Sequence, residues 1–318
     1  MKRITLSIIT LTTLISIFMS GCAKKSSVNN NVATNPTTTE ATTEENLTTD
    51  EVTTEVPTEE TTEAPTEAPT EAPTEAPTEA PTKAPSVSDP AGLDNSLITY
   101  GPGVNVDELN RPHASVNAQN LYGSYDAYFV KFDTNEVYLT FDLGYEYNNN
   151  TPKILDILKE KNVKAVFFPT MSFIERNPET IKRIIDEGHM LGNHSNTHPS
   201  MPSLTVEQMT SEIMTLHNYI LENYNYTITL FRPPQGHFSY QSLALTQSLG
   251  YKTVMWSFAY ADYFTDNQPD VSVALQNAVS KAHPGAIYLL HAVSNTNVAM
   301  LGDLIDALQE NYTVALLK

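Results

Sequence analysis

Residues 137–142 read Val-Tyr-Leu-Thr-Phe-Asp, five apolar, aromatic or β-branched residues followed by one carboxylate. A run of this kind, without a polar residue at every second position, indicates a strand that is covered on both faces. Short runs of the same character recur along the chain, and stretches of helical periodicity separate them. We predict strands at residues 137–141, 165–168, 190–192, 227–231, 253–256, 286–290 and 313–316.

The stretches between these strands carry helix signals. Thr151 precedes Pro152 at the start of residues 153–161, so a hydroxyl is available as a cap and proline occupies the first turn. The other helices are expected at residues 179–187, opened by Asn177-Pro178 and ended by Gly188, at 206–223 after a capping box from Thr205 to Gln208, and at 240–249, 271–282 and 298–310.

Seven strands that alternate with six helices predict an α/β fold built from parallel βαβ units, either an open doubly wound sheet or a barrel. The chain lacks a Gly-x-Gly-x-x-Gly after the first strand and lacks a Gly-x-x-x-x-Gly-Lys loop, which argues against a dinucleotide site and excludes a P-loop. Its 18 basic and 37 acidic residues give a net charge of −19, which argues against a nucleic-acid partner. A single cysteine excludes an intramolecular disulfide.

Residues 1–22 have the pattern of a secretory signal. Lys2 and Arg3 precede an apolar run that is short for a membrane span. The run ends in Met-Ser-Gly-Cys at Cys22, which resembles a bacterial lipobox. That resemblance implies a mature protein that begins at a lipidated Cys22 and is anchored to the outer face of the cytoplasmic membrane, in the cell-wall space. The alternative is an ordinary cleaved signal with an incidental cysteine.

Residues 23–95 are rich in Thr, Glu, Pro and Ala and contain no aromatic residue. The unit Glu-Ala-Pro-Thr repeats without interruption from Glu63 to Thr82. Proline at every fourth position excludes a helix and removes backbone donors that a sheet needs, so we predict a disordered, extended tether. The globular domain is therefore expected at residues 96–318.

Polar residues follow five of the predicted strands. Sites in both α/β architectures form beyond the carboxyl ends of the strands, so we expect one site here. Each of these residue types, taken singly, is also common in a purely structural role: an aspartate after a strand often caps a helix, and a histidine that ends an apolar strand is often a core residue. The residues are Asp142, His194 with His198, Arg232, Asp262 and His291.

Together these stretches resemble the five motifs of the polysaccharide deacetylases of carbohydrate esterase family 4, the NodB-homology domain. The resemblance implies a distorted (β/α) barrel of about seven parallel strands and the hydrolysis of an N-acetyl amide on a glycan. Within the family, four segments resemble the peptidoglycan de-N-acetylases that form muramic δ-lactam. They are Thr140–Glu146, Arg232–Ser239, Trp256–Pro269 and Ala282–Asn297.

The resemblance also implies roles for the motif residues. His194 and His198 would hold a divalent cation, which could be Zn, Mn, Co or Mg, and this cation would lower the pKa of a bound water. Asp142 would be the catalytic base that takes the water's proton. Arg232 would orient Asp142 and keep it ionised through a charge-assisted hydrogen bond.

On the other side of the substrate, His291 would protonate the leaving amine. Asp262 would pair with His291 and raise the pKa of its imidazole. Gln235 would help to stabilise the oxyanion through its amide. Tyr145 is the best candidate for an aromatic side chain that stacks on a sugar ring, whereas Trp256 and Phe258 are expected in the core.

The sequence departs from the family pattern at Leu143, where the family has a second aspartate that binds the metal. This leaves two histidines and one possible oxygen from Asp142, whereas catalytic zinc usually has three protein ligands. Ala259 and Tyr263 likewise replace the Asp and Trp of the fourth motif.

Three functions remain open. The first is a monomeric peptidoglycan deacetylase acting on N-acetylmuramic acid in glycan strands. The second is the same enzyme acting on N-acetylglucosamine in peptidoglycan or chitin oligomers. The third is a non-catalytic protein that binds wall glycan.

Overall fold

The structure is a computed structural model that describes residues 89–318. The predicted signal, Cys22 and the predicted linker up to residue 88 lie outside the described residues. Residues 89–95 already belong to the folded part, because η1 (Pro90–Gly92) is followed by a backbone bond from the Gln241 N–H to the Asp94 carbonyl. The folded part therefore begins a few residues before position 96. Within the described part, no helix is both long and apolar enough to cross a membrane.

All seven predicted strands are present, and they pair in parallel. Three further strands of two residues each, β1, β2 and β7, were not predicted. In chain order the strands are β1 (Ile98–Thr99), β2 (Ala127–Tyr128), β3 (Glu136–Leu143), β4 (Val166–Pro169), β5 (Met190–Leu191), β6 (Leu230–Phe231), β7 (His237–Phe238), β8 (Lys252–Val254), β9 (Ile287–His291) and β10 (Thr313–Ala315). The pair β1–β7 is antiparallel.

The parallel strands form two sheets that close on each other. In the first, β3 pairs with β4, β9 and β10, and β4 pairs with β5; in the second, β8 lies between β2 and β6. Two isolated parallel bridges join the sheets, Asn193 with Phe231 and Phe258 with Tyr288. The result is a barrel whose two sheets are joined at each of these two places by a single bridge. This irregular closure agrees with the distorted barrel that was predicted.

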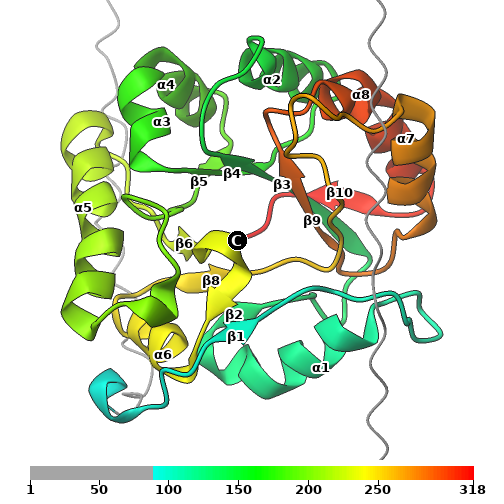
Figure 1. Cartoon of the computed structure of the whole chain (residues 1–318). Coiled ribbons are helices and arrows are strands. Elements are labelled where there is room, and N and C mark those ends of the chain that lie inside the picture. The colour runs from blue at the N-terminus through cyan, green and yellow to red at the C-terminus, as the bar shows by residue number, and fades with distance from the viewer. Residues whose placement is uncertain (1–88) are drawn as a thin grey trace, which may run out of the picture. The chain divides into compact units, whose positions relative to one another are not determined.

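The helices surround this barrel, as Figure 1 shows in a view along its axis. Six of them were predicted, whereas α1 and α3 were not. The helices are α1 (His113–Tyr122), α2 (Asn150–Glu160), α3 (Met171–Arg176), α4 (Pro178–Asp186), α5 (Val206–Tyr224), α6 (Tyr240–Ser248), α7 (Val271–Ser280) and α8 (Asn295–Gln309).

The predicted caps have different outcomes. The capping box between Thr205 and Gln208 is confirmed. The predicted cap from Thr151 is wrong, because α2 begins at Asn150 and already includes Thr151, and Glu146 accepts the N–H groups of both residues at the helix N-terminus. Asn177 occupies the N-cap position of α4 but its side chain donates to the Phe173 carbonyl, so it does not cap the helix either.

The strands bury two separate layers of apolar side chains. Along β3, Val137, Leu139, Phe141 and Leu143 pack in the layer that includes the residues of α2, α4, α5 and α8. Tyr138, between the first two, belongs to the other layer, with Phe168, Leu230, Ile287 and Leu289 from neighbouring strands. Alternate residues of a strand point to opposite faces, so Thr140 and Asp142 share the inner face with Tyr138.

Candidate active site

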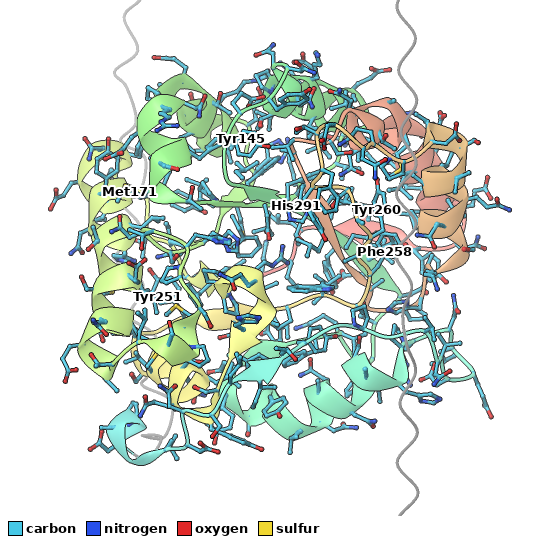
Figure 2. The ribbon with its side chains drawn as sticks, viewed as in Figure 1. Tyr145, Met171, Tyr251, Phe258, Tyr260 and His291 are labelled. Carbon is cyan, nitrogen blue, oxygen red and sulfur yellow. The ribbon has the colours of Figure 1, made fainter. Side chains whose placement is uncertain are left out.

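The inner face of the barrel becomes polar at the carboxyl ends of its strands. The two-residue period carries Leu230 to Arg232 and Leu289 to His291 on the same face as Asp142. The parallel register of β3 and β9 sets Asp142 directly opposite His291. The strand pattern therefore gathers these three polar side chains at one end of the barrel, where Figure 2 shows His291 near the centre of the ring of elements.

Arg232 is fully buried and holds Asp142. Its Nη1 donates to Asp142 Oδ1 over 2.8 Å. The remaining donors reach Thr140 Oγ1 at 2.8 Å and the carbonyls of Val254 and Met255 at 3.0 and 3.2 Å. Burial by itself would raise the pKa of Asp142, but the charge and hydrogen bond of Arg232, together with the charges of His194 and His291, lower that pKa below its usual value. Asp142 is therefore held ionised.

His194 is buried beside this carboxylate in a defined tautomer. Its Nδ1 lies 2.9 Å from the Arg232 carbonyl, which can only accept, so the proton is on Nδ1. Nε2 is then the unprotonated nitrogen, and it lies 3.5 Å from Asp142 Oδ2. Burial lowers the pKa of His194 to about 4, so the imidazole is neutral and is a competent metal ligand.

The loop of residues 193–198 brings the second histidine next to the first. The His198 ring lies 4.8 Å from the His194 ring, centroid to centroid, at an angle of 74°. Ser195 and His198 both have left-handed backbones, with φ of 66° and 63°. Asn193 stabilises this turn by accepting the Ser195 N–H and donating to the Ile213 carbonyl. Residues other than glycine rarely adopt a left-handed backbone conformation. Its presence at two positions of this loop indicates that the loop conformation serves to place the two histidines next to each other.

The donor set fits a divalent cation in its chemistry. His194 and His198 offer imidazole nitrogens, and Asp142 offers its second carboxylate oxygen. Within residues 89–318, no three His, Cys, Asp or Glu side chains already converge as a complete metal-binding group. Leu143 is fully buried in the layer between sheet and helices, so it adds nothing polar to this site.

Asp262 and His291 form a second cluster. Asp262 is fully buried, and its Oδ1 lies 2.7 Å from His291 Nδ1 while its Oδ2 accepts the His291 backbone N–H over 2.8 Å. Burial by itself would lower the pKa of His291, but the hydrogen bond and the charge of Asp262 raise it above its usual value. The ring thus tends to carry a proton, and its Nε2 faces away from Asp262.

Exposed aromatic and amide side chains follow the strand ends that carry these clusters. Tyr145 follows β3 and is 49% exposed, as expected of a side chain that could stack on a sugar. Tyr263 is 50% exposed and lies edge-on to the His291 ring at 5.5 Å. Gln235 is exposed with a left-handed backbone of φ 62°, and no contact ties its side chain to the buried clusters within the described residues. Trp256 and Phe258 are buried, as predicted.

Three residues to which the sequence analysis gave no role also contribute to these clusters. Thr140 and Asn193 hold Arg232 and the histidine loop, as described above. Asn297, on α8, donates to Asp262 Oδ2 over 2.6 Å. Thr140 is signalled by the period of β3, because it lies two residues before Asp142. A buried asparagine in a helix carries no such pattern, and only the packing of α8 reveals it.

Comparison with known proteins identifies relatives of this chain. A family model described as polysaccharide deacetylase matches residues 130–254. Peptidoglycan-N-acetylmuramic acid deacetylase PdaA of Bacillus subtilis is 42% identical over 206 residues, which is 64% of this chain and 78% of that protein. The solved structure of Bacillus subtilis PdaA, a family 4 carbohydrate esterase, matches with a TM-score of 0.66 and 38% identity, over 70% of this chain and 96% of that one.

A more distant relative has a different substrate in its name. Peptidoglycan-N-acetylglucosamine deacetylase PgdA of Listeria monocytogenes is 31% identical over 198 residues, which is 62% of this chain and 41% of that protein. The barrel, the residues at its carboxyl end and these similarities agree. The chain belongs to the polysaccharide deacetylases of carbohydrate esterase family 4.

Proposed function

We propose that this protein hydrolyses the N-acetyl group of N-acetylmuramic acid in peptidoglycan. The observation that carries the proposal is the pairing of an ionised Asp142, held by Arg232, with a protonated His291, held by Asp262, directly opposite each other on β3 and β9. Two groups with pKa values pushed in opposite directions are suited to act as base and acid. The similarity to the Bacillus subtilis enzyme supports muramic acid as the sugar.

Asp142 serves the first half of the reaction. Its carboxylate accepts a proton from the attacking water as the water oxygen bonds to the acetyl carbon. Arg232 keeps the carboxylate ionised and fixes Oδ1, so Oδ2 is left for the water. A divalent cation held by His194 and His198 would supply Lewis-acid polarisation of the acetyl carbonyl. Gln235 would offer its amide to the oxyanion.

His291 serves the second half. The carbon–nitrogen bond of the amide breaks, and His291 Nε2 gives its proton to the departing nitrogen, which leaves as an amine beside acetate. An amine is a poor leaving group without that proton, so this step needs an acid that stays charged near neutral pH. The raised pKa of His291 meets this requirement.

The test is mass spectrometry of peptidoglycan digested with the purified full chain, with EDTA and with added Zn²⁺ or Mn²⁺. We expect metal-dependent loss of acetyl from muramic acid, followed or not by loss of water to the lactam. Loss of acetyl from glucosamine alone would show that the enzyme acts on N-acetylglucosamine instead. No mass change under any cation, on intact or peptide-stripped glycan, would contradict the proposal and leave a glycan-binding protein.

Paired variants make this test specific. Asp142→Asn removes the base but keeps its shape, and we expect it to abolish activity. Asp156→Asn removes one exposed carboxylate of α2 and should leave activity unchanged. His194→Gln should weaken binding of Zn²⁺, measured by calorimetry independently of activity.

The proposal also covers the location of the enzyme. The Met-Ser-Gly-Cys sequence ending at Cys22 supports lipidation and an anchor on the outer face of the cytoplasmic membrane. Cys22→Ala should release the protein from membranes, with unchanged activity. Incorporation of labelled fatty acid into the Cys22→Ala variant would contradict this anchor.

A further inference from the structure

Asn297 completes the cluster around Asp262 and His291. It is fully buried near the start of α8. Its Nδ2 donates to Asp262 Oδ2 over 2.6 Å and to the His291 backbone carbonyl over 3.0 Å. One amide group therefore contacts both members of the pair, the first through its carboxylate and the second through its backbone.

The orientation of this amide is determined by its partners. Both groups facing Nδ2, a carboxylate and a carbonyl, can only accept, so the NH₂ group must point to them. On the other side, the Tyr260 hydroxyl donates to Asn297 Oδ1. Burial, and then the charge of Asp262, raise the pKa of Tyr260, so it keeps its proton as a donor.

Asp262 depends on this support. Its Oδ2 receives the His291 backbone N–H and the Asn297 amide, which leaves Oδ1 to face His291 Nδ1. Without the amide, a fully buried carboxylate would lose one of its three hydrogen bonds and one of the groups that hold its plane. The direction of the His291 ring, and with it the direction of Nε2, follows from that plane.

We propose that Asn297, oriented by Tyr260, is a positioning residue that aims the His291 proton at the leaving amine nitrogen. The inference rests on the proposed function, because it assigns a role within the same site. Asn297 does not touch the substrate and acts through Asp262. The proton passes from His291 Nε2 to the amide nitrogen as the carbon–nitrogen bond breaks, and Asn297 itself gains and loses nothing.

The experiment compares an amide with an activated ester in the same full-length protein. Release of acetate from peptidoglycan requires a proton on the leaving amine, whereas p-nitrophenyl acetate expels a stabilised phenolate that needs no acid. Asp142→Asn should lose both activities, which shows that the ester uses this site. His291→Ala should lose the amide activity and keep the ester activity. Its loss of amide activity is the reference for the variants of Asn297.

Three variants then test the residue itself. We expect Asn297→Ala to lower kcat for the amide about 10-fold or more, with ester hydrolysis within about twofold of wild type. Asn297→Asp keeps the shape but sets a carboxylate against Asp262, so its amide activity should fall about 100-fold or further. Tyr260→Phe removes only the hydroxyl and should give a smaller loss of the same kind. In the double variant with Asp262→Ala, Asn297→Ala should add nothing.

Each outcome has a distinct meaning. Thr246→Val removes a buried side-chain hydrogen bond on α6 and is the matched control, with both activities kept. If Asn297→Ala lost amide and ester activity in parallel, or lost neither, the positioning role would be wrong. If the wild-type protein released no acetate from peptidoglycan, the proposed function itself would fail.

Discussion

Arg232 and Asp142 form an ion pair of 2.8 Å between two side chains that are almost completely removed from solvent. The guanidinium makes three other hydrogen bonds and lies 4.3 Å from the centroid of the Phe168 ring, so its position is fixed from several sides. A buried pair of this kind is weak evidence for stability, but the removal of one partner leaves an uncompensated buried charge. The pair therefore stabilises the fold and also keeps Asp142 in the ionised form that a base needs.

Arg232→Met should be strongly destabilising and nearly inactive. We expect the free energy of unfolding to fall by about 3–5 kcal/mol, because Asp142 then lies buried without its counter-charge. Lys182→Met breaks an exposed ion pair with Asp186 on α4 and should leave the free energy of unfolding almost unchanged. Urea denaturation of both variants measures the difference. Equal losses would show that burial adds nothing to the Arg232 pair.

The pH dependence of deacetylation should follow His291 at its basic limb. The acid is needed protonated, so kcat falls as pH rises through the pKa of His291, which Asp262 raises above the ordinary value of 6.5. Asp262→Asn removes the charge that raises it, so the basic limb should move to lower pH. Rate profiles of wild type and Asp262→Asn check this. An unmoved limb would assign it to another group.

Two glycines should respond oppositely to alanine. Gly285, before β9, has φ 76°, and a Cβ there would lie 1.8 Å from the Lys131 carbonyl oxygen. Gly285→Ala should therefore cost about 2 kcal/mol or more. Gly302 lies inside α8, where a Cβ would meet only ordinary contacts, so Gly302→Ala should stabilise by about 0.5–1 kcal/mol. Thermal unfolding compares them, and a shift in the same direction for both would contradict this expectation.

The sequence predicts those elements whose buried residues form a recognisable pattern along the chain. The strand at residues 137–141 is apolar throughout because helices cover one face and the barrel interior the other, and the structure has β3 at Glu136–Leu143. Length alone does not decide, because β5 and β6 also have two residues and were predicted, whereas β1, β2 and β7 were not. Helix α1 follows a proline, has no capping side chain at its start and was not predicted.

Within the candidate site too, a physical reason separates the residues that could be predicted from those that could not. Residues that directly follow a strand, such as Asp142 and Arg232, can be located because the strand's direction is known. The supporting contacts cannot, because they join segments far apart in the chain. Asn297 reaches Asp262 across 35 positions, and Thr140 reaches Arg232 across 92. The wrong cap at Thr151 has a different cause, because Glu146 lies only five positions earlier in the chain and accepts the N–H groups at the start of α2 in its place.

His189 gives a stability prediction outside the site. It is 3% exposed, its Nδ1 accepts the Ala165 N–H over 3.2 Å, and burial lowers its pKa to about 4. Above its ordinary pKa of 6.5, the ring is neutral whether the chain is folded or unfolded. As pH falls through 6.5 toward 4, only the unfolded chain takes up the proton, so stability is lost in this window.

The consequence can be isolated by one substitution. His189→Asn keeps an acceptor for the Ala165 N–H but cannot be protonated, so its free energy of unfolding should fall less between about pH 7.5 and about pH 5 than that of wild type, by on the order of 1–2 kcal/mol. His113 is exposed at the start of α1, and His113→Asn should follow the wild-type dependence. Urea denaturation at the two pH values makes the comparison. If His189→Asn lost as much stability as wild type on acidification, the buried neutral histidine would not be the group that senses acid.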